Sequence, residues 1–92
     1  MDIKDLSENN KKNELIELAK FYFLNNKYVD ALKELEKAKK IDQKDPEIFY
    51  NMGIIFEAKG DTDKAKELYQ KTLEISPKHD SAKKRLDQLI GT

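Results

Sequence analysis

Apolar residues recur along this 92-residue chain at the spacing of helices rather than strands. Turn-forming residues interrupt the pattern and divide it into five predicted helices, over about residues 7–24, 28–41, 46–59, 61–75 and 80–90. Ser7 is a candidate cap for the first helix. Asp45-Pro46 marks the start of the third, because aspartate caps an N-terminus and proline fits the first turn. No segment alternates between polar and apolar residues, so we predict an all-α protein.

The predicted helices differ in the number of apolar faces they carry. The second and fourth each have one stripe, whereas the first and third each have two. The core stripes follow the i, i+3, i+4, i+7 spacing and consist of Leu15, Leu18, Ala19 and Tyr22 in one helix and Phe49, Met52, Gly53 and Phe56 in the other. The second apolar sets lie about 110° around each helix and contain Ile16, Phe23 and Leu24 or Tyr50 and Ile54. A helix of this kind either packs on both sides or lines a groove.

The first two predicted helical hairpins match each other when Leu15 is aligned with Phe49. The same shift pairs Ala19 with Gly53, Ala31 with Ala65, Leu35 with Tyr69 and Ile41 with Ile75. Small residues at these positions let helices approach closely, and the larger ones fill the space beside them. A period of about 34 residues in helix–turn–helix units is typical of stacked helical repeats.

The second copy carries Phe49-x-x-Met52-Gly53-x-x-Phe56, followed by Ala65, Tyr69 and Pro77. These residues resemble the tetratricopeptide repeat (TPR) pattern, W-x₂-L-G-x₂-Y…A-x₃-F…P. The first copy departs from the pattern at Leu15, Ala19, Asn26 and Gln43, which replace the Trp, the Gly, the turn Gly and the Pro. The resemblance implies a short right-handed α-solenoid with an N-terminal extension (1–11), two TPR hairpins (12–45 and 46–79) and a capping helix (80–92).

The resemblance also implies where a partner binds. In TPR proteins the first helix of each hairpin lines a concave surface, and the second apolar sets fall on that surface. The implied groove consists of Ile16, Lys20, Phe23, Leu24, Tyr50, Asn51, Ile54, Glu57 and Ala58, with Lys84, Arg85 and Gln88 at one end. Phe23 and Tyr50 are the expected anchors, because aromatic rings supply contact area at low entropic cost. The alternative is that Ile16, Phe23 and Ile54 pack inside the superhelix or against the N-terminal residues Ile3 and Leu6.

One TPR subclass grips the C-terminal carboxylate of chaperones with a clamp of five polar residues. The corresponding positions here are Ile16, Lys20, Asn51, Ser81 and Arg85, of which only Asn51 and Arg85 agree in kind. We therefore disfavour binding of chaperone tails. Arg85 and its neighbour Lys84 either pair with an acidic group of another ligand or form a solvated helix face.

Composition narrows the classes of partner. The 18 Lys and Arg residues balance the 18 Asp and Glu residues, which argues against a nucleic-acid binder. No apolar run is long enough to span a membrane, and the N-terminus lacks the apolar core of a secretion signal, so we expect a cytoplasmic location. The chain has no cysteine and one histidine, His79, which we interpret as a loop residue. We accordingly expect no metal site, no cofactor and no catalytic constellation.

The sequence therefore predicts a non-enzymatic protein–protein interaction module, which binds a peptide or helical segment of a partner in its apolar groove. Two alternatives stay open. The chain forms a homodimer that buries the groove against a second copy, or it is an engineered or truncated TPR fragment without a native ligand.

Overall fold

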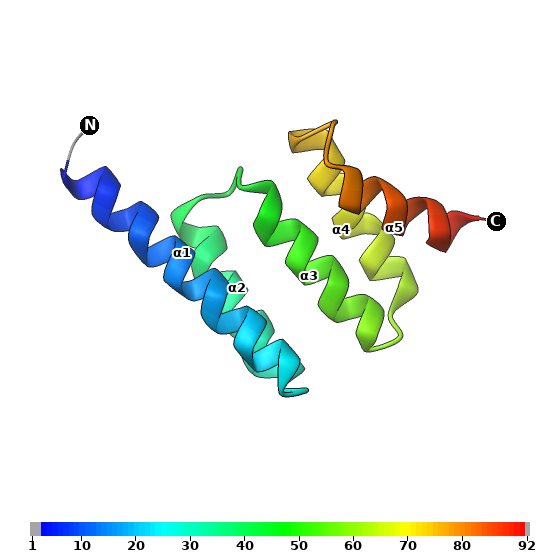
Figure 1. The fold of residues 1–92 in the computed structure, drawn as a ribbon, viewed down its shortest axis with the longest axis horizontal. Coiled ribbons are helices and arrows are strands. Elements are labelled where there is room, and N and C mark those ends of the chain that lie inside the picture. Colours follow the sequence, from blue (N-terminus) through cyan, green and yellow to red (C-terminus); the bar gives the residue numbers. More distant parts are fainter. Residues whose placement is uncertain (1–2, 92) are drawn as a thin grey trace. The chain divides into compact units, whose positions relative to one another are not determined.

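Five α-helices account for most of residues 3–91, the part of the chain that the computed structural model describes (Figure 1). The helices are α1 (Ile3–Leu24), α2 (Tyr28–Ile41), α3 (Pro46–Ala58), α4 (Thr62–Ile75) and α5 (Asp80–Ile90). This part of the chain contains no strand, so the predicted all-α class is confirmed. Helices α2 to α5 also keep their predicted bounds to within one residue.

The chain divides after Lys44 into two compact units. In the first unit α1 packs on α2. In the second unit α3 packs on α4, and α5 packs on the same helix. The helical hairpins and the terminal helix are thus present as predicted, whereas the right-handed course of the solenoid stays a prediction.

Helix α1 begins earlier than the sequence predicted. Ser7, the expected cap, lies inside the helix, which starts at Ile3. Residues 3–11 therefore extend α1, while Met1 and Asp2 lie outside the described residues. The prediction of a cap at Ser7 is wrong because serine also tolerates a helix interior, at a cost of only about 0.5 kcal/mol relative to alanine, and no glycine or proline precedes it.

The two hairpin turns repeat each other at the atomic level. Asn26 and Gly60, which occupy equivalent positions of the two repeats, both adopt a left-handed backbone, with φ of 62° and 86°. In each turn the next residue donates a backbone hydrogen bond of 2.9 Å, from Lys27 to Tyr22 and from Asp61 to Phe56. Glycine reaches this conformation without steric cost, and asparagine is one of the few other residues that tolerate it. Asn26 therefore replaces the turn glycine of the first repeat without changing the turn.

The hairpins differ in how the second helix is capped. Asp61 accepts a hydrogen bond from the backbone N–H of Lys64 at 3.2 Å, whereas Lys27 provides α2 with no side-chain cap. The backbone angles of the two cap residues are similar (φ −95°, ψ 71° at Lys27; φ −88°, ψ 79° at Asp61). A carboxylate introduced at position 27 would therefore be in place to cap α2.

We expect Lys27→Asp to raise the free energy of unfolding by about 1 kcal/mol, because a good N-cap contributes this much and an acid also favours the positive helix end. Urea denaturation followed by circular dichroism measures the change. Lys27→Ala is the matched control, since it removes the lysine and supplies no acceptor. An equal gain in both variants would contradict capping as the cause.

The core of the first unit combines small and larger apolar side chains. Its buried apolar residues are Leu15, Ile16, Ala19, Ala31, Leu35 and Ala38. Leu18, which the sequence assigned to the same core stripe, is exposed instead. Within this unit α1 packs only on α2, and at about 100° per residue Leu18 lies at the edge of the face that carries Ala19.

The second unit has a core between α4 and its two neighbours. Ala65 and Tyr69 of α4 form a buried cluster with Ala82 and Leu86 of α5. Helix α3 approaches this cluster at Gly53, where an added Cβ would lie only 2.6 Å from Cε1 of Tyr69. The absence of a side chain at Gly53 is what lets the tyrosine ring fit.

Candidate functional site

The four predicted groove residues of the first unit differ in accessibility. Ile16 is buried, with only 6% of its surface exposed, and so offers little contact area. Phe23 is half-buried, and its ring centre lies 5.6 Å from that of Tyr28. Lys20 and Leu24 are exposed. Among the predicted groove residues of this unit, Lys20, Leu24 and part of Phe23 are therefore accessible.

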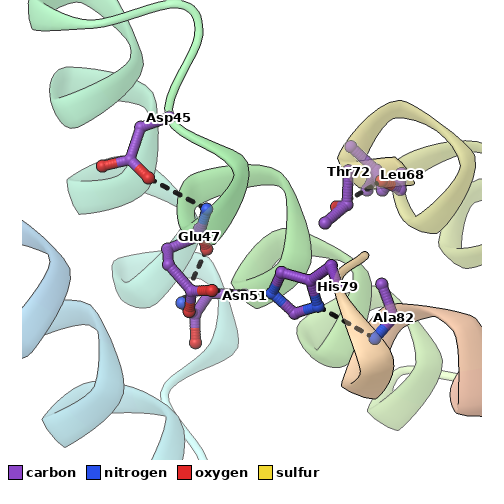
Figure 2. A network of polar contacts seen from close by, with 7 residues as sticks. All are labelled: Asp45, Glu47, Asn51, Leu68, Thr72, His79 and Ala82. Atoms are coloured by element: carbon purple, nitrogen blue, oxygen red, sulfur yellow. Dashed lines mark hydrogen bonds and ion pairs between the residues drawn. The ribbon is translucent and has the colours of Figure 1, made fainter. Parts of the chain in front are cut away.

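The predicted residues of the second unit lie on α3 and α5, which two polar bridges connect. At one end the carboxylate of Glu47 lies 2.6 Å from Nε2 of His79 (Figure 2). At the other end Nε of Arg85 donates to Oε1 of Glu57 at 3.1 Å, and a second guanidinium nitrogen pairs with Oε2. The two glutamates are ten residues apart on α3, or about 15 Å at 1.5 Å per residue. The bridges thus enclose a strip of α3 that is about three turns long.

An apolar floor lies between these bridges. Tyr50 and Ile54 are half-buried and pack against the core cluster of the second unit. The ring of Tyr50 lies 4.8 Å from the ring of His79 and 5.9 Å from that of Tyr69, measured between ring centres. One side of each residue is therefore anchored, and the other side is accessible. We call Tyr50, Asn51 and Ile54, together with the two bridges, the α3–α5 face.

Asn51 supplies the polar group of this face. One N–H of its side chain donates to the backbone carbonyl of Glu47 at 2.7 Å (Figure 2). This bond orients the amide and leaves its side-chain oxygen as an acceptor for a ligand. Three other predicted residues are exposed, Ala58 at the end of α3 and Lys84 and Gln88 on α5.

Glu57 and Arg85 are engaged with each other and with a buried tyrosine. The hydroxyl of Tyr69 donates to Oε1 of Glu57 at 2.8 Å. Burial raises the pKa of Tyr69, and the hydrogen bond to Glu57 raises it further. The same carboxylate raises the pKa of Arg85. An acidic group of a ligand would have to compete with Glu57 for the guanidinium, so these residues form a wall of the face more readily than a free cation site.

Sequence reasoning missed the role of His79. The residue is the N-cap of α5, since its Nδ1 accepts a hydrogen bond from the backbone N–H of Ala82 at 3.1 Å (Figure 2). Because Nδ1 is the acceptor, the ring proton sits on Nε2 and is donated to Glu47. A signal was present in the sequence, because position 79 is the equivalent, one repeat later, of Asp45, the N-cap of α3.

The described residues also bear on metal binding and on membrane insertion. No group of three or more His, Cys, Asp and Glu side chains in this part of the chain is arranged to hold a metal ion. None of the described helices is long and apolar enough to cross a membrane.

The sequence of the chain is similar to known proteins of one family. Residues 19–60 match a family model described as TPR repeat, and residues 46–79 match one described as tetratricopeptide repeat. The chain is 36% identical over 69 residues to Tetratricopeptide repeat protein 14 of Mus musculus, an alignment that covers 75% of this chain and 9% of the relative. It is 38% identical over 65 residues to Photosystem I assembly protein Ycf3 of Prochlorococcus marinus, which covers 67% of this chain and 38% of the relative.

Proposed function

We propose that this chain, which belongs to the tetratricopeptide repeat family of protein-interaction modules, binds a partner protein on its α3–α5 face. The ligand is a short peptide or helical segment of that partner. The observation that carries the proposal is the position of Tyr50 and Ile54. Both are anchored on the core at one side, remain accessible on the other, and lie between two polar bridges. An apolar centre with a polar rim is typical of protein contacts.

The chemistry of the face suits a peptide. Tyr50 is held by the rings of His79 and Tyr69, so a partner that covers it loses little side-chain entropy on the module's side. Asn51 offers a carbonyl oxygen to a backbone N–H, as peptide-binding surfaces commonly do. Lys84 lies on the exposed side of α5 and adds a positive charge at the rim. We expect a ligand with one buried apolar side chain and an acidic or neutral flank.

The positions of α1 equivalent to Tyr50 and Ile54 are Ile16 and Lys20. Because Ile16 is buried and Lys20 is charged, the first unit offers a weaker face. The prediction that Lys20, Phe23 and Leu24 contact the same partner stays a prediction. The likeness to an assembly protein agrees with a role in bringing proteins together, and we propose no catalytic activity for this chain.

Peptides selected from a random display library against the wild-type chain provide a ligand with which to test the face. We expect Tyr50→Ala to weaken their binding at least tenfold, about 1.4 kcal/mol, because aromatic anchors dominate such contacts. Lys84→Glu, which removes no packing, should weaken peptides with acidic flanks by a smaller factor. Fluorescence anisotropy measures both effects.

Val29→Ser is the matched control, since Val29 is an exposed apolar residue on α2, outside the α3–α5 face. Circular dichroism establishes that each variant is folded. Equal affinity of the selected peptides for the wild type, Tyr50→Ala and Lys84→Glu would remove the face as the binding site.

A further inference from the structure

The imidazole of His79 contacts three groups of the second unit at once. Its Nδ1 accepts a hydrogen bond from the backbone N–H of Ala82 at 3.1 Å, and its Nε2 lies 2.6 Å from a carboxylate oxygen of Glu47 (Figure 2). The ring also packs against Tyr50, with 4.8 Å between the ring centres. Only 13% of the histidine side chain is exposed. The state of this ring therefore affects both the start of α5 and the apolar centre of the α3–α5 face.

The cap of α5 depends on the protonation state of the ring. A backbone N–H can only donate, so it bonds to Nδ1 only while this nitrogen carries no proton. In the imidazolium both ring nitrogens carry protons, and the N–H of Ala82 would then face a second donor. Ala82 is a buried residue, and a buried donor without an acceptor is costly. The capped helix and the doubly protonated ring therefore exclude each other.

The side-chain caps of the other two helices in this unit are carboxylates. Asp45 caps α3, and Asp61 caps α4. Aspartate as a residue type stays ionised, and so remains an acceptor, above about pH 5. Histidine is the residue type that changes its charge between about pH 5 and 8. Mild acid therefore acts on the cap of α5 and leaves the caps of α3 and α4 in place.

The groups of α3 that face the ring favour its retention on that helix after protonation. Glu47 pairs more strongly with an imidazolium than with a neutral ring, because both partners are then charged. Tyr50, the other titratable residue of α3 beside the ring, belongs to a residue type that is uncharged in neutral and acidic solution. At the start of α5, by contrast, a positive ring meets the positive end of the helix. The protonated ring should therefore keep Glu47 and release Ala82.

The charges on the neighbouring segments nearly balance. In the last two turns of α4 the charged residues are Lys71 and Glu74, which pair with each other at 3.9 Å. Lys78 and Asp80, on either side of the histidine in the chain, are both exposed and opposite in sign. Lys83 adds one exposed positive charge on the next turn of α5. The direction of the effect is therefore set by the two hydrogen bonds of the ring.

We propose that protonation of His79 is a switch that loosens the first turn of α5 and, with it, the α3–α5 face. The capped helix holds one proton fewer than the uncapped helix with an imidazolium, so a fall in pH shifts the population toward the uncapped form. Tyr50 then loses a support whose position α5 had fixed. The consequence for ligands rests on the function proposed for the α3–α5 face: a peptide bound at neutral pH is held less tightly in mild acid.

Amide exchange measured by NMR tests the opening of the helix without a ligand. The N–H groups of Ala82 and Lys64 occupy the same position in their helices, the first bonded to His79 and the second to Asp61. From about pH 7.5 to about pH 5.5 we expect the protection of Ala82, corrected for the intrinsic exchange rate at each pH, to fall at least about fivefold. The protection of Lys64 should stay the same. Equal behaviour of the two amides would overturn the proposal.

The matched variant is His79→Asn, because asparagine is among the best N-caps and does not titrate in this range. In this variant the protection of Ala82 should not depend on pH. A fall as large as that in the wild type would assign the loss to other groups and contradict the switch. The comparison of Ala82 with Lys64 within the wild type decides the question even if circular dichroism shows the variant to be unfolded.

Peptide binding tests the link to the face. Selected peptides with blocked termini and without His, Asp or Glu keep their charge in this range, so any pH dependence belongs to the protein. We expect their affinity for the wild type to fall at least about threefold from about pH 7.5 to about pH 5.5, and their affinity for His79→Asn to be equal at both. Each protein is compared with itself, because His79 is part of the face.

The two measurements separate the possible failures. A wild-type affinity that does not change with pH would refute the link between the cap and the face, whatever the amide exchange shows. Peptides that bind Tyr50→Ala as tightly as the wild type would instead count against the face itself, while the exchange of Ala82 still decides whether the first turn of α5 opens in mild acid.

Discussion

Replacing Gly53 with valine should lower the free energy of unfolding by about 3 kcal/mol, the upper end of the cost of overpacking a core. A Cβ at this position would lie 2.6 Å and 2.8 Å from Cε1 and Cδ1 of Tyr69. The ring has little freedom to retreat, because Tyr69 is fully buried and its hydroxyl donates to Glu57. Urea denaturation followed by circular dichroism measures the loss.

The first hairpin supplies the control for this prediction. Its equivalent residues are Ala19 and Leu35, so it carries a Cβ at the position of Gly53 and a smaller side chain at the position of Tyr69. We expect Gly53→Ala to cost about 1–2 kcal/mol in the wild type. In a Tyr69→Leu background the same change should become neutral or favourable, since alanine has the better helix propensity. Additive effects in this double-mutant cycle would show that the ring is not the obstacle.

Alkaline solution should destabilise the protein through Tyr69. Burial and the hydrogen bond to Glu57 raise the pKa of its hydroxyl above the ordinary value, which is about 10 in the unfolded chain. Above that pH the unfolded state loses a proton that the folded state keeps. The stabilisation is complete below pH 10, and the free energy of unfolding then falls by up to about 1.4 kcal/mol per pH unit.

Denaturant titrations at a series of pH values from neutrality to about 12 measure this slope. Tyr69→Phe is the control, because it keeps the ring and removes the ionising hydroxyl. We expect the variant to be less stable by about 1 kcal/mol at neutral pH, through loss of the hydrogen bond to Glu57. Its stability should fall less steeply above pH 10. Parallel curves for the two proteins would assign the alkaline loss to other groups, such as the lysines.

The helix boundaries could be predicted because they depend on local chemistry. Asp45-Pro46 starts α3, with the aspartate accepting from the N–H of Glu47 at 2.9 Å, and Lys59-Gly60 ends it. The start of α2 could be predicted in the same way, because Asn26 tolerates the left-handed conformation of the turn before it. Ser7 misled the prediction because a potential cap is used only where the chain before it cannot continue the helix.

The distribution of buried residues was harder to predict. Periodicity places residues around a helix, but it does not say how wide the covered arc is. Ile48 and Ile55 are buried although they lie outside the predicted core stripe of α3, while Leu18 is exposed although it lies within the stripe of α1. Burial at such edge positions depends on how many helices surround each one.

The polar part of the candidate site depended on contacts between distant residues. Nothing local to Glu57 or Arg85 indicates that they pair, because 28 residues separate them. The sequence placed both on one surface but assigned them to a partner instead of to each other. Among the apolar members, Tyr50 and Ile54 are half-buried between these bridges, whereas Ile16 is buried.

The capping of α5 by a histidine makes this ring a reporter of the last helix. One ring nitrogen accepts a hydrogen bond from the backbone N–H of Ala82, and the other donates a hydrogen bond to Glu47. Both ring nitrogens are therefore hydrogen-bonded while the first turn of α5 is intact. Acylating reagents need the lone pair of the accepting nitrogen as a nucleophile. The rate at which His79 is modified should therefore follow how often the first turn of α5 opens. Because the chain has a single imidazole, the modification rate of histidine can be assigned to His79 without a label.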